Sequence, residues 1–160
     1  MKTFRGALVP EDPERRASWR IGIVASTFNE HVTERLVSGA LDALRKHRIA
    51  EEQLTVVWVP GAWGLPIAAR SLVRSRSVHA IVACGAVIEG ETQHFDYVAG
   101  EAAGGLSKVG HEFGVPIGFG VLTTRTTEQA IERAGGKAGN KGAEAARVVL
   151  EMLDLLTQLE

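Results

Sequence analysis

Four apolar runs, each followed by a stretch with helical spacing, constrain the fold of this chain more than any other feature of its sequence. Residues 21–25 (IGIVA) and 80–88 (AIVACGAVI) are apolar throughout, which is typical of strands buried on both faces of a parallel sheet. Strands that alternate with helices four times predict a layered α/β fold. The expected strands are residues 20–26, 54–59, 80–88 and 115–122, and the expected helical stretches are 31–47, 65–74, 93–112 and about 127–159, interrupted at 135–142.

The expected helix at 31–47 has one apolar face. Its apolar residues recur at helical intervals, which indicates that this face packs against the sheet. The final helical stretch has the same pattern. The two apolar faces consist of Val32, Leu36, Val37, Ala40, Leu41 and Leu44, and of Ala145, Val148, Val149, Met152, Leu155 and Leu156.

The N-terminal residues are set apart from this alternation. Residues 4–9 are expected to form a short strand, which Pro10, Asp12 and Pro13 then separate from the rest of the chain. A detached strand of this kind can pair with a neighbouring subunit. With 160 residues, of which 45% are hydrophobic, the chain is expected to form a single domain. Residues 1–18 would be its N-terminal strand and linker, and residues 19–160 its α/β core.

The composition limits the kinds of partner. The near balance of 18 lysines and arginines against 19 aspartates and glutamates gives no electrostatic reason to expect nucleic acid or an anionic membrane. A small anionic ligand needs only a local site. Cys84 is the only cysteine, so no intrachain disulfide can form. Without an evident signal peptide or membrane-spanning run, we expect a cytoplasmic protein. No residue cluster suggests a metal site or a Cys-His or Ser-His-Asp nucleophile.

The loops that follow the expected strands meet at one edge of the sheet, where open α/β sheets bind ligands. Phe28 follows the first strand, and it either packs against the next helix or offers a stacking surface to a planar ligand. Trp63 follows the second strand in the segment VPGAWGLP, and the same two interpretations apply to it.

The loop after the third strand has the clearest chemistry. Gly90 is expected to take a left-handed or strained conformation, and Thr92 to cap the next helix. The free amides that follow suit a phosphate oxygen. His94, one turn inside the helix, can donate or accept a proton there, although a histidine in the first turn of a helix can also be structural. Its position beside the loop favours the chemical role.

A glycine-rich segment at residues 132–146 contains Arg133, Lys137 and Lys141. It lacks the spacing of a phosphate-binding P-loop, and no strand directly precedes it, so we exclude an NTPase. Lys137 is expected to be a solvated helix end. Arg133 is either another one or a bidentate phosphate ligand. The other histidines, His31, His47, His79 and His111, are expected to be surface or packing residues.

Taken together, these loops resemble the 6,7-dimethyl-8-ribityllumazine synthase family, from Phe4 to about Met152. The resemblance implies a flavodoxin-like, three-layer α/β/α sandwich with a central four-stranded parallel sheet. It also implies a homo-oligomer: a pentamer that in many members closes into an icosahedral shell. The segments that carry it are TFNEHVTERLVSGALDAL, VPGAWGLPIAA, GAVIEGETQHFDYV, GVLTT and EQAIERAGGKAGNKGAEAA.

The same resemblance implies an activity that needs no cofactor. It is the condensation of 5-amino-6-(D-ribitylamino)uracil with 3,4-dihydroxy-2-butanone 4-phosphate in riboflavin biosynthesis. His94 would shuttle protons, and Arg133 would reach the phosphate from an adjacent subunit together with Phe119. The implied substrate-binding residues are Phe28 on the pyrimidine, Ala62, Trp63, Gly64, Ala86, Val87 and Ile88 around it, Glu91 and Thr92 on the phosphate, and Lys141 at the polar edge of the heterocycle.

Four positions in these loops depart from the usual pattern of the family. Thr27, Glu89 and Gln93 stand where arginine, arginine and proline are common, and Gly64 stands where glutamate is expected. Gly64 removes a carboxylate that would accept hydrogen bonds from a ligand, and Glu89 reverses a charge close to the expected phosphate. The alternative interpretation is therefore a shell-forming scaffold of the same fold with impaired catalysis.

Overall fold

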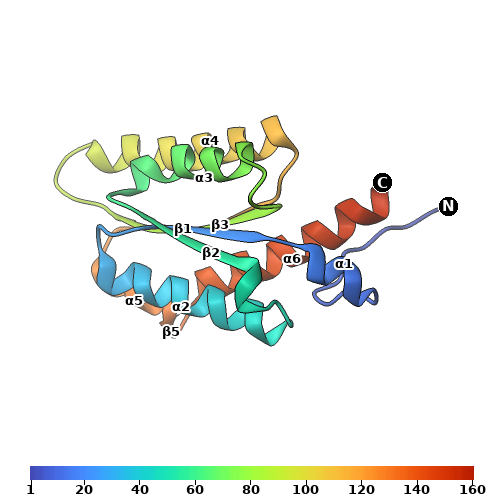
Figure 1. Cartoon of the computed structure of the whole chain (residues 1–160). Coiled ribbons are helices and arrows are strands. Elements are labelled where there is room, and N and C mark those ends of the chain that lie inside the picture. The colour runs from blue at the N-terminus through green and yellow to red at the C-terminus, as the bar shows by residue number, and fades with distance from the viewer.

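The computed structural model describes residues 1–160 and has a parallel sheet between two layers of helices (Figure 1). The strand order is β2-β1-β3-β4, and every neighbouring pair is parallel. This confirms the expected flavodoxin-like, three-layer α/β/α architecture. The strands are β1 (Ile21–Ser26), β2 (Leu54–Val59), β3 (Ala80–Ile88) and β4 (Ile117–Thr124). One face carries α3 (Leu65–Arg74) and α4 (His94–Phe113), and the other carries α2 (Glu30–Lys46), α5 (Thr127–Glu132) and α6 (Lys141–Leu159).

The position of each strand explains its composition. β1 and β3 are central, and their apolar runs are buried almost throughout, as the sequence predicts. β2 is an edge strand and is largely exposed, with Val56 and Trp58 both partly in solvent. Two short 3₁₀ helices, η1 (Glu51–Gln53) and η2 (Ala62–Gly64), lie on either side of β2 in the chain. The open edge of β2 therefore offers unpaired backbone groups to another strand.

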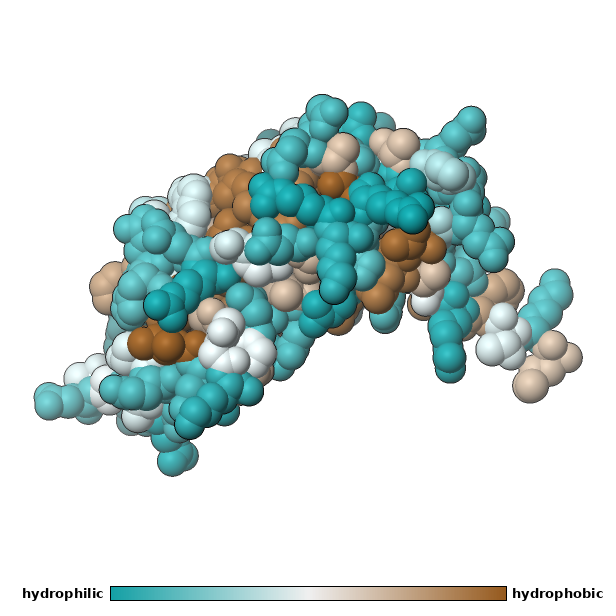
Figure 2. Space-filling view, turned by 90° about the horizontal axis from the view of Figure 1, so that it is seen from below, coloured by the Kyte–Doolittle hydropathy of each residue, from teal (hydrophilic) through white to brown (hydrophobic).

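The apolar face predicted for α2 is confirmed, but the face predicted for α6 is partly wrong. In α2, the predicted residues other than the half-buried Leu41 are buried. In α6, Val148 and Met152 are exposed instead. The buried face of α6 is centred on Ala146, Val149, Leu150 and Leu153, because α6 packs against both α2 and the sheet. Figure 2 views this side, where hydrophobic side chains form small separate patches on a mainly hydrophilic surface.

The interruption predicted near the C-terminal end is a two-stranded hairpin. Antiparallel strands β5 (Ala134–Gly136) and β6 (Gly139–Asn140) join α5 to α6. Gly135 and Gly139 have φ angles of 102° and 81°, in a region that side chains strongly disfavour. These glycines permit the tight reversal that the sequence predicts between the two helices.

The predicted strand at residues 4–9 is wrong for the single chain. This segment has no regular secondary structure, bends at Leu8 and Val9, and pairs with no strand of its own chain. A short helix that the sequence analysis missed, α1 (Pro13–Ser18), follows it. The signal for α1 was present, because Asp12 accepts hydrogen bonds from the Glu14 and Arg15 amides, and Pro13 occupies the first helical position.

Asp154 of α6 holds this N-terminal segment. Its side chain is buried and accepts hydrogen bonds of 2.8 Å from both the Ala7 amide and the Gln158 side chain. Arg15 approaches the other carboxylate oxygen at 3.7 Å. Gly6 passes so close to the Glu151 carbonyl that a Cβ atom would not fit there. The path of the N-terminal segment is therefore determined by contacts with the last helix.

Replacement of Asp154 by alanine is expected to lower the free energy of unfolding by about 1–3 kcal/mol, because it leaves partly buried donors without an acceptor. Urea denaturation measures this loss. Trypsin should also cleave the variant faster at Arg5. The control is Asp42→Ala, which removes an exposed carboxylate from α2. Equal stability of the two variants would show that Asp154 does not anchor the segment.

Candidate active site

A cavity of about 840 Å³ opens at the carboxyl edge of the sheet, between the loops that follow β1, β2 and β3 and the start of α4. β1 and β3 are adjacent, but their following helices cover opposite faces of the sheet, so a crevice forms between the two loops. The predicted site residues that line the cavity are Phe28, Ala62, Trp63, Ala86, Val87, Ile88, Thr92 and His94.

The loop after β1 is tied to the neighbouring strands. The Phe28 amide donates to the Pro60 carbonyl at 2.9 Å. Asn29 has a φ angle of 62°, and its side-chain amide donates to the Ala86 carbonyl at 2.9 Å. These bonds leave the Phe28 side chain 72% exposed at the cavity wall. Phe28 therefore does not pack against the next helix within the single chain, and its ring is free to stack on a ligand.

Trp63 has a similar exposure. It lies in η2, its side chain is 61% exposed, and it lines the cavity. Leu65, two residues further on at the start of α3, is fully buried and fills the core position next to this loop. Gly64 does not line the cavity. An added Cβ there would meet only Val59, at 3.6 Å, so the backbone can accommodate a side chain.

The β3–α4 loop, yellow-green at the left edge of Figure 1, differs in two details from the prediction. Gly90 does not have a positive φ angle, so the left-handed conformation expected for it is wrong. The helix begins at His94 with Gln93 at its cap position, so Thr92 is not the cap residue. The Thr92 hydroxyl accepts a long hydrogen bond of 3.4 Å from the His94 amide. The loop is exposed, with bends at Glu91 and Thr92 and a turn at Gln93.

This loop presents unused donors beside the imidazole. The amides of Gly90, Glu91, Thr92 and Gln93 donate no hydrogen bond within the chain, although Glu91 itself does not line the cavity. They precede a 20-residue helix, whose N-terminal end attracts anions through its free amides and its dipole. The His94 side chain is exposed and also has no partner in the chain. The arrangement can bind an anionic group and transfer a proton next to it.

Other predicted residues lie elsewhere in the single chain. Phe119 is on β4 and faces a separate shallow depression. Arg133 ends α5, where its guanidinium donates to the Gln129 carbonyl at 3.0 Å and lies 4.0 Å from Glu132. Lys141 begins α6 and pairs with Glu144 at 2.8 Å. Within one chain, these three residues do not line the cavity that contains His94.

Several cavity residues were missed by the sequence analysis as ligand contacts. Asn29, Pro60 and Gly61 belong to the loops already singled out, so their position in sequence was a usable signal. Phe95, Tyr97 and Val98 come from the first turns of α4, and Tyr97 is 68% exposed. The spacing of three between His94 and Tyr97 places them on neighbouring positions of one helix, which could have identified Tyr97.

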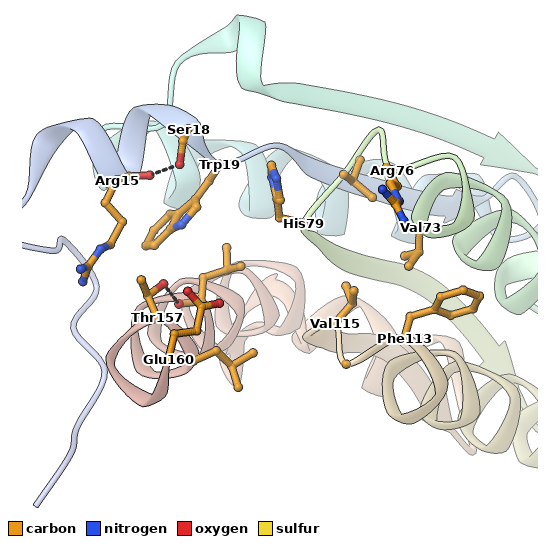
Figure 3. A pocket seen from close by; sticks show the side chains of 14 residues that line it. Arg15, Ser18, Trp19, Val73, Arg76, His79, Phe113, Val115, Thr157 and Glu160 are labelled. Carbon is orange, nitrogen blue, oxygen red and sulfur yellow. Dashed lines mark hydrogen bonds between the residues drawn. The ribbon is translucent and has the colours of Figure 1, made fainter.

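A second cavity, of about 660 Å³, lies at the opposite edge of the sheet (Figure 3). His79 faces it, and its Nδ1 accepts a 2.8 Å hydrogen bond from the Arg20 amide. The His79 amide donates in turn to the Arg20 carbonyl at 2.7 Å. The two residues thereby join the starts of β1 and β3, which agrees with the structural role expected for His79.

The remaining chemistry-bearing groups do not form a site. Cys84 lies in the central strand β3, and burial raises the pKa of its thiol to about 12, so it is uncharged at neutral pH. No group of three or more His, Cys, Asp and Glu side chains is arranged to hold a metal ion. None of the helices is both long and apolar enough to cross a lipid bilayer.

The fold and the cavity together define a flavodoxin-like α/β protein with a candidate small-molecule site at the carboxyl edge of its parallel sheet. Aromatic rings and the free amides beside a histidine characterise that site. The family model for 6,7-dimethyl-8-ribityllumazine synthase matches residues 18–157, and the chain belongs to that family. Family membership supports a transferase role in riboflavin biosynthesis.

Proposed function

We propose that the chain condenses 5-amino-6-(D-ribitylamino)uracil with 3,4-dihydroxy-2-butanone 4-phosphate to 6,7-dimethyl-8-ribityllumazine. The observation that carries the proposal is the position of the free amides of the β3–α4 loop directly before His94, at the rim of a cavity with exposed aromatic rings. The amides suit the phosphate group, and the aromatic rings suit the flat pyrimidine.

Each part of the cavity has a proposed task. The Phe28 ring stacks on the pyrimidine, and the backbone of residues 62–63 and 86–88 lines its edges. The amides of Glu91 and Thr92 bind the phosphate. His94 then transfers protons while the amine of one substrate and the carbonyl of the other form an imine with loss of water, and again while phosphate leaves. The rest of the catalytic effect comes from holding two substrates in a reactive orientation.

We propose that a neighbouring subunit completes this site. Phe119, Arg133 and Lys141 do not line the His94 cavity of their own chain, and we place them at the cavity of an adjacent copy. The exposed aromatic side chains of Phe28, Trp63 and Tyr97 form an apolar rim that a second subunit would cover. The proposed assembly is a pentamer that can close into an icosahedral shell.

The open edge of β2 offers the place for the N-terminal segment of another copy. Residues 1–4 extend beyond the contacts of Asp154 and are exposed. A fifth strand added at β2 would cover Val56 and Trp58 and satisfy the free backbone groups of the edge. The predicted pairing of residues 4–9 with a neighbour stays a proposal about the assembly. Within the single chain, Arg5, Gly6 and Ala7 contact α6, which leaves Phe4 and the residues before it available for that pairing.

The test is spectroscopic measurement of lumazine formation with both substrates, together with light scattering of the same sample. A rate well above the spontaneous reaction and a particle of at least five subunits are the expected results. A rate equal to the spontaneous background would remove the enzymatic proposal. A monomer at micromolar concentration would contradict the shared site.

Gly64 supports the second candidate function, a shell-forming scaffold with weakened catalysis. It leaves the corner beside Trp63 without the carboxylate that the family pattern places there. The scaffold proposal predicts large closed particles and no heat of substrate binding in calorimetry.

Replacement of Gly64 by glutamate tests whether the missing carboxylate weakens substrate binding, as the scaffold proposal requires. Gly64 has a φ angle of −85° and open surroundings, so the variant is expected to fold. A restored hydrogen-bond acceptor should tighten binding of the pyrimidine substrate about tenfold, equivalent to about 1.4 kcal/mol. Gly100→Glu, at an exposed helical position with open surroundings, is the control for an added charge. Unchanged substrate affinity in Gly64→Glu would show that Gly64 does not limit binding.

A further inference from the structure

The negative charge of Glu89 lies next to the proposed phosphate site. It immediately precedes the loop whose amides are free to bind an anion, and a carboxylate there repels a phosphate-bearing substrate. The structure places a cation next to it. The Arg125 Nε lies 3.8 Å from the Glu89 carboxylate, at the start of the segment that joins β4 to α5.

The backbone brings these two residues together. Ile88 and Thr124 are paired in register between β3 and β4, and the Glu89 amide donates to the Thr124 carbonyl at 2.8 Å. The Arg125 amide donates to the Gln129 side chain at 2.9 Å, which orients the start of the turn. The facing of residues 89 and 125 therefore follows from strand register and does not depend on the flexible side chains alone.

Neither side chain lines the cavity that contains His94. Glu89 and Arg125 line the shallow depression on the β4 side, together with Phe119 and Asp96. Arg125 is the only cationic residue that lines this depression. Of the two carboxylates there, Glu89 and Asp96, it forms an ion pair with Glu89. The contact that the structure gives Arg125 next to the loop of residues 90–92 is therefore its ion pair with Glu89.

We propose that Arg125 is a positioning residue that neutralises Glu89 and so permits the β3–α4 loop to bind a phosphate group. This inference rests on the proposed function. It accounts for an acidic residue at position 89, where the family pattern has arginine. The ion pair is largely exposed, with the Arg125 side chain 86% and the Glu89 side chain 48% in solvent, so the effect on binding is expected to be a few-fold.

A cycle of neutral variants tests the proposal. Arg125→Gln leaves Glu89 unpaired and should raise the KM for the phosphate substrate about threefold to fivefold, with kcat nearly unchanged. Glu89→Gln removes the repelling charge and should not raise KM. The double variant Glu89→Gln/Arg125→Gln should return KM to within about twofold of the parent, because no unpaired carboxylate remains. The effect of Arg125→Gln should shrink as salt is added.

Two results would overturn the inference. Equal KM values for Arg125→Gln and for the parent would show that the pair has no influence on the site. Equally raised values for Arg125→Gln and the double variant would show that Arg125 acts independently of Glu89. Arg74→Gln, which removes an exposed arginine from the far end of α3, is the control.

Titration calorimetry with inorganic phosphate repeats the cycle without turnover. If the parent makes no lumazine but its phosphate affinity follows the same pattern, the proposed reaction fails and the inference about Arg125 stands. If lumazine forms but both the KM and the phosphate affinity are unchanged in the variants, the inference fails and the proposed reaction stands.

Discussion

His94→Ala is expected to lower the rate of lumazine formation about a hundredfold, the lower end of what a positioned acid–base group contributes. His94 begins α4 at the cavity rim, and its side chain has no hydrogen-bond partner within the chain that would be lost. The variant should therefore retain the stability of the parent. Substrate affinity should change little, because the free amides of the loop are backbone groups that alanine leaves in place.

The matched control for this prediction is on the same helix. His111 lies in the last turn of α4, is exposed, and is far along the helix from the cavity. His111→Ala should keep the parent rate. Rates of lumazine formation are compared at saturating concentrations of both substrates, with the spontaneous reaction subtracted. Equal rates for His94→Ala and His111→Ala would exclude His94 as a proton-transfer group.

Arg133→Ala is expected to weaken binding of the phosphate substrate by about tenfold or more, because a charge-assisted hydrogen bond contributes about 1.5–3 kcal/mol. The Arg133 side chain is half-exposed, and its only hydrogen bond within the chain is to the Gln129 carbonyl. The loss should therefore fall on binding more than on stability. Lys137→Ala, in the exposed hairpin between β5 and β6, is the control and should keep the parent KM.

Mixing the two impaired variants, at a phosphate-substrate concentration below the KM of Arg133→Ala, tests whether one site uses two chains. In a mixed ring, a His94→Ala subunit supplies Arg133, and its Arg133→Ala neighbour supplies His94. Random mixing after dissociation and reassembly should restore about a quarter of the sites, since the interface is head-to-tail. Activity of the mixture above the average of the two separate variants is the expected result. No gain, with mixing confirmed by mass spectrometry, would place both residues in the same chain's site or outside it.

The sequence predicted where the site loops lie better than it predicted their backbone conformations. The loops after β1, β2 and β3 were expected at one edge of the sheet, and they do line one cavity. The left-handed conformation expected as one alternative for Gly90 is wrong, and the cap lies at Gln93 and not at Thr92, because local residue preferences leave several loop conformations with similar free energy. Asn29 was overlooked because its task, donating to the Ala86 carbonyl, depends on a strand distant in the sequence.

The parallel sheet, its layers and the edge that carries the candidate site all follow from the residue pattern. Continuous apolar runs can be buried only in central strands, and the 3.6-residue period allows only one side of each helix to face them. The buried face of α6, the path of the N-terminal segment and the pairing of Glu89 with Arg125 could be seen only in the folded chain. These features depend on packing angles and strand register, which bring together residues far apart in the chain and leave no periodic signal in its sequence.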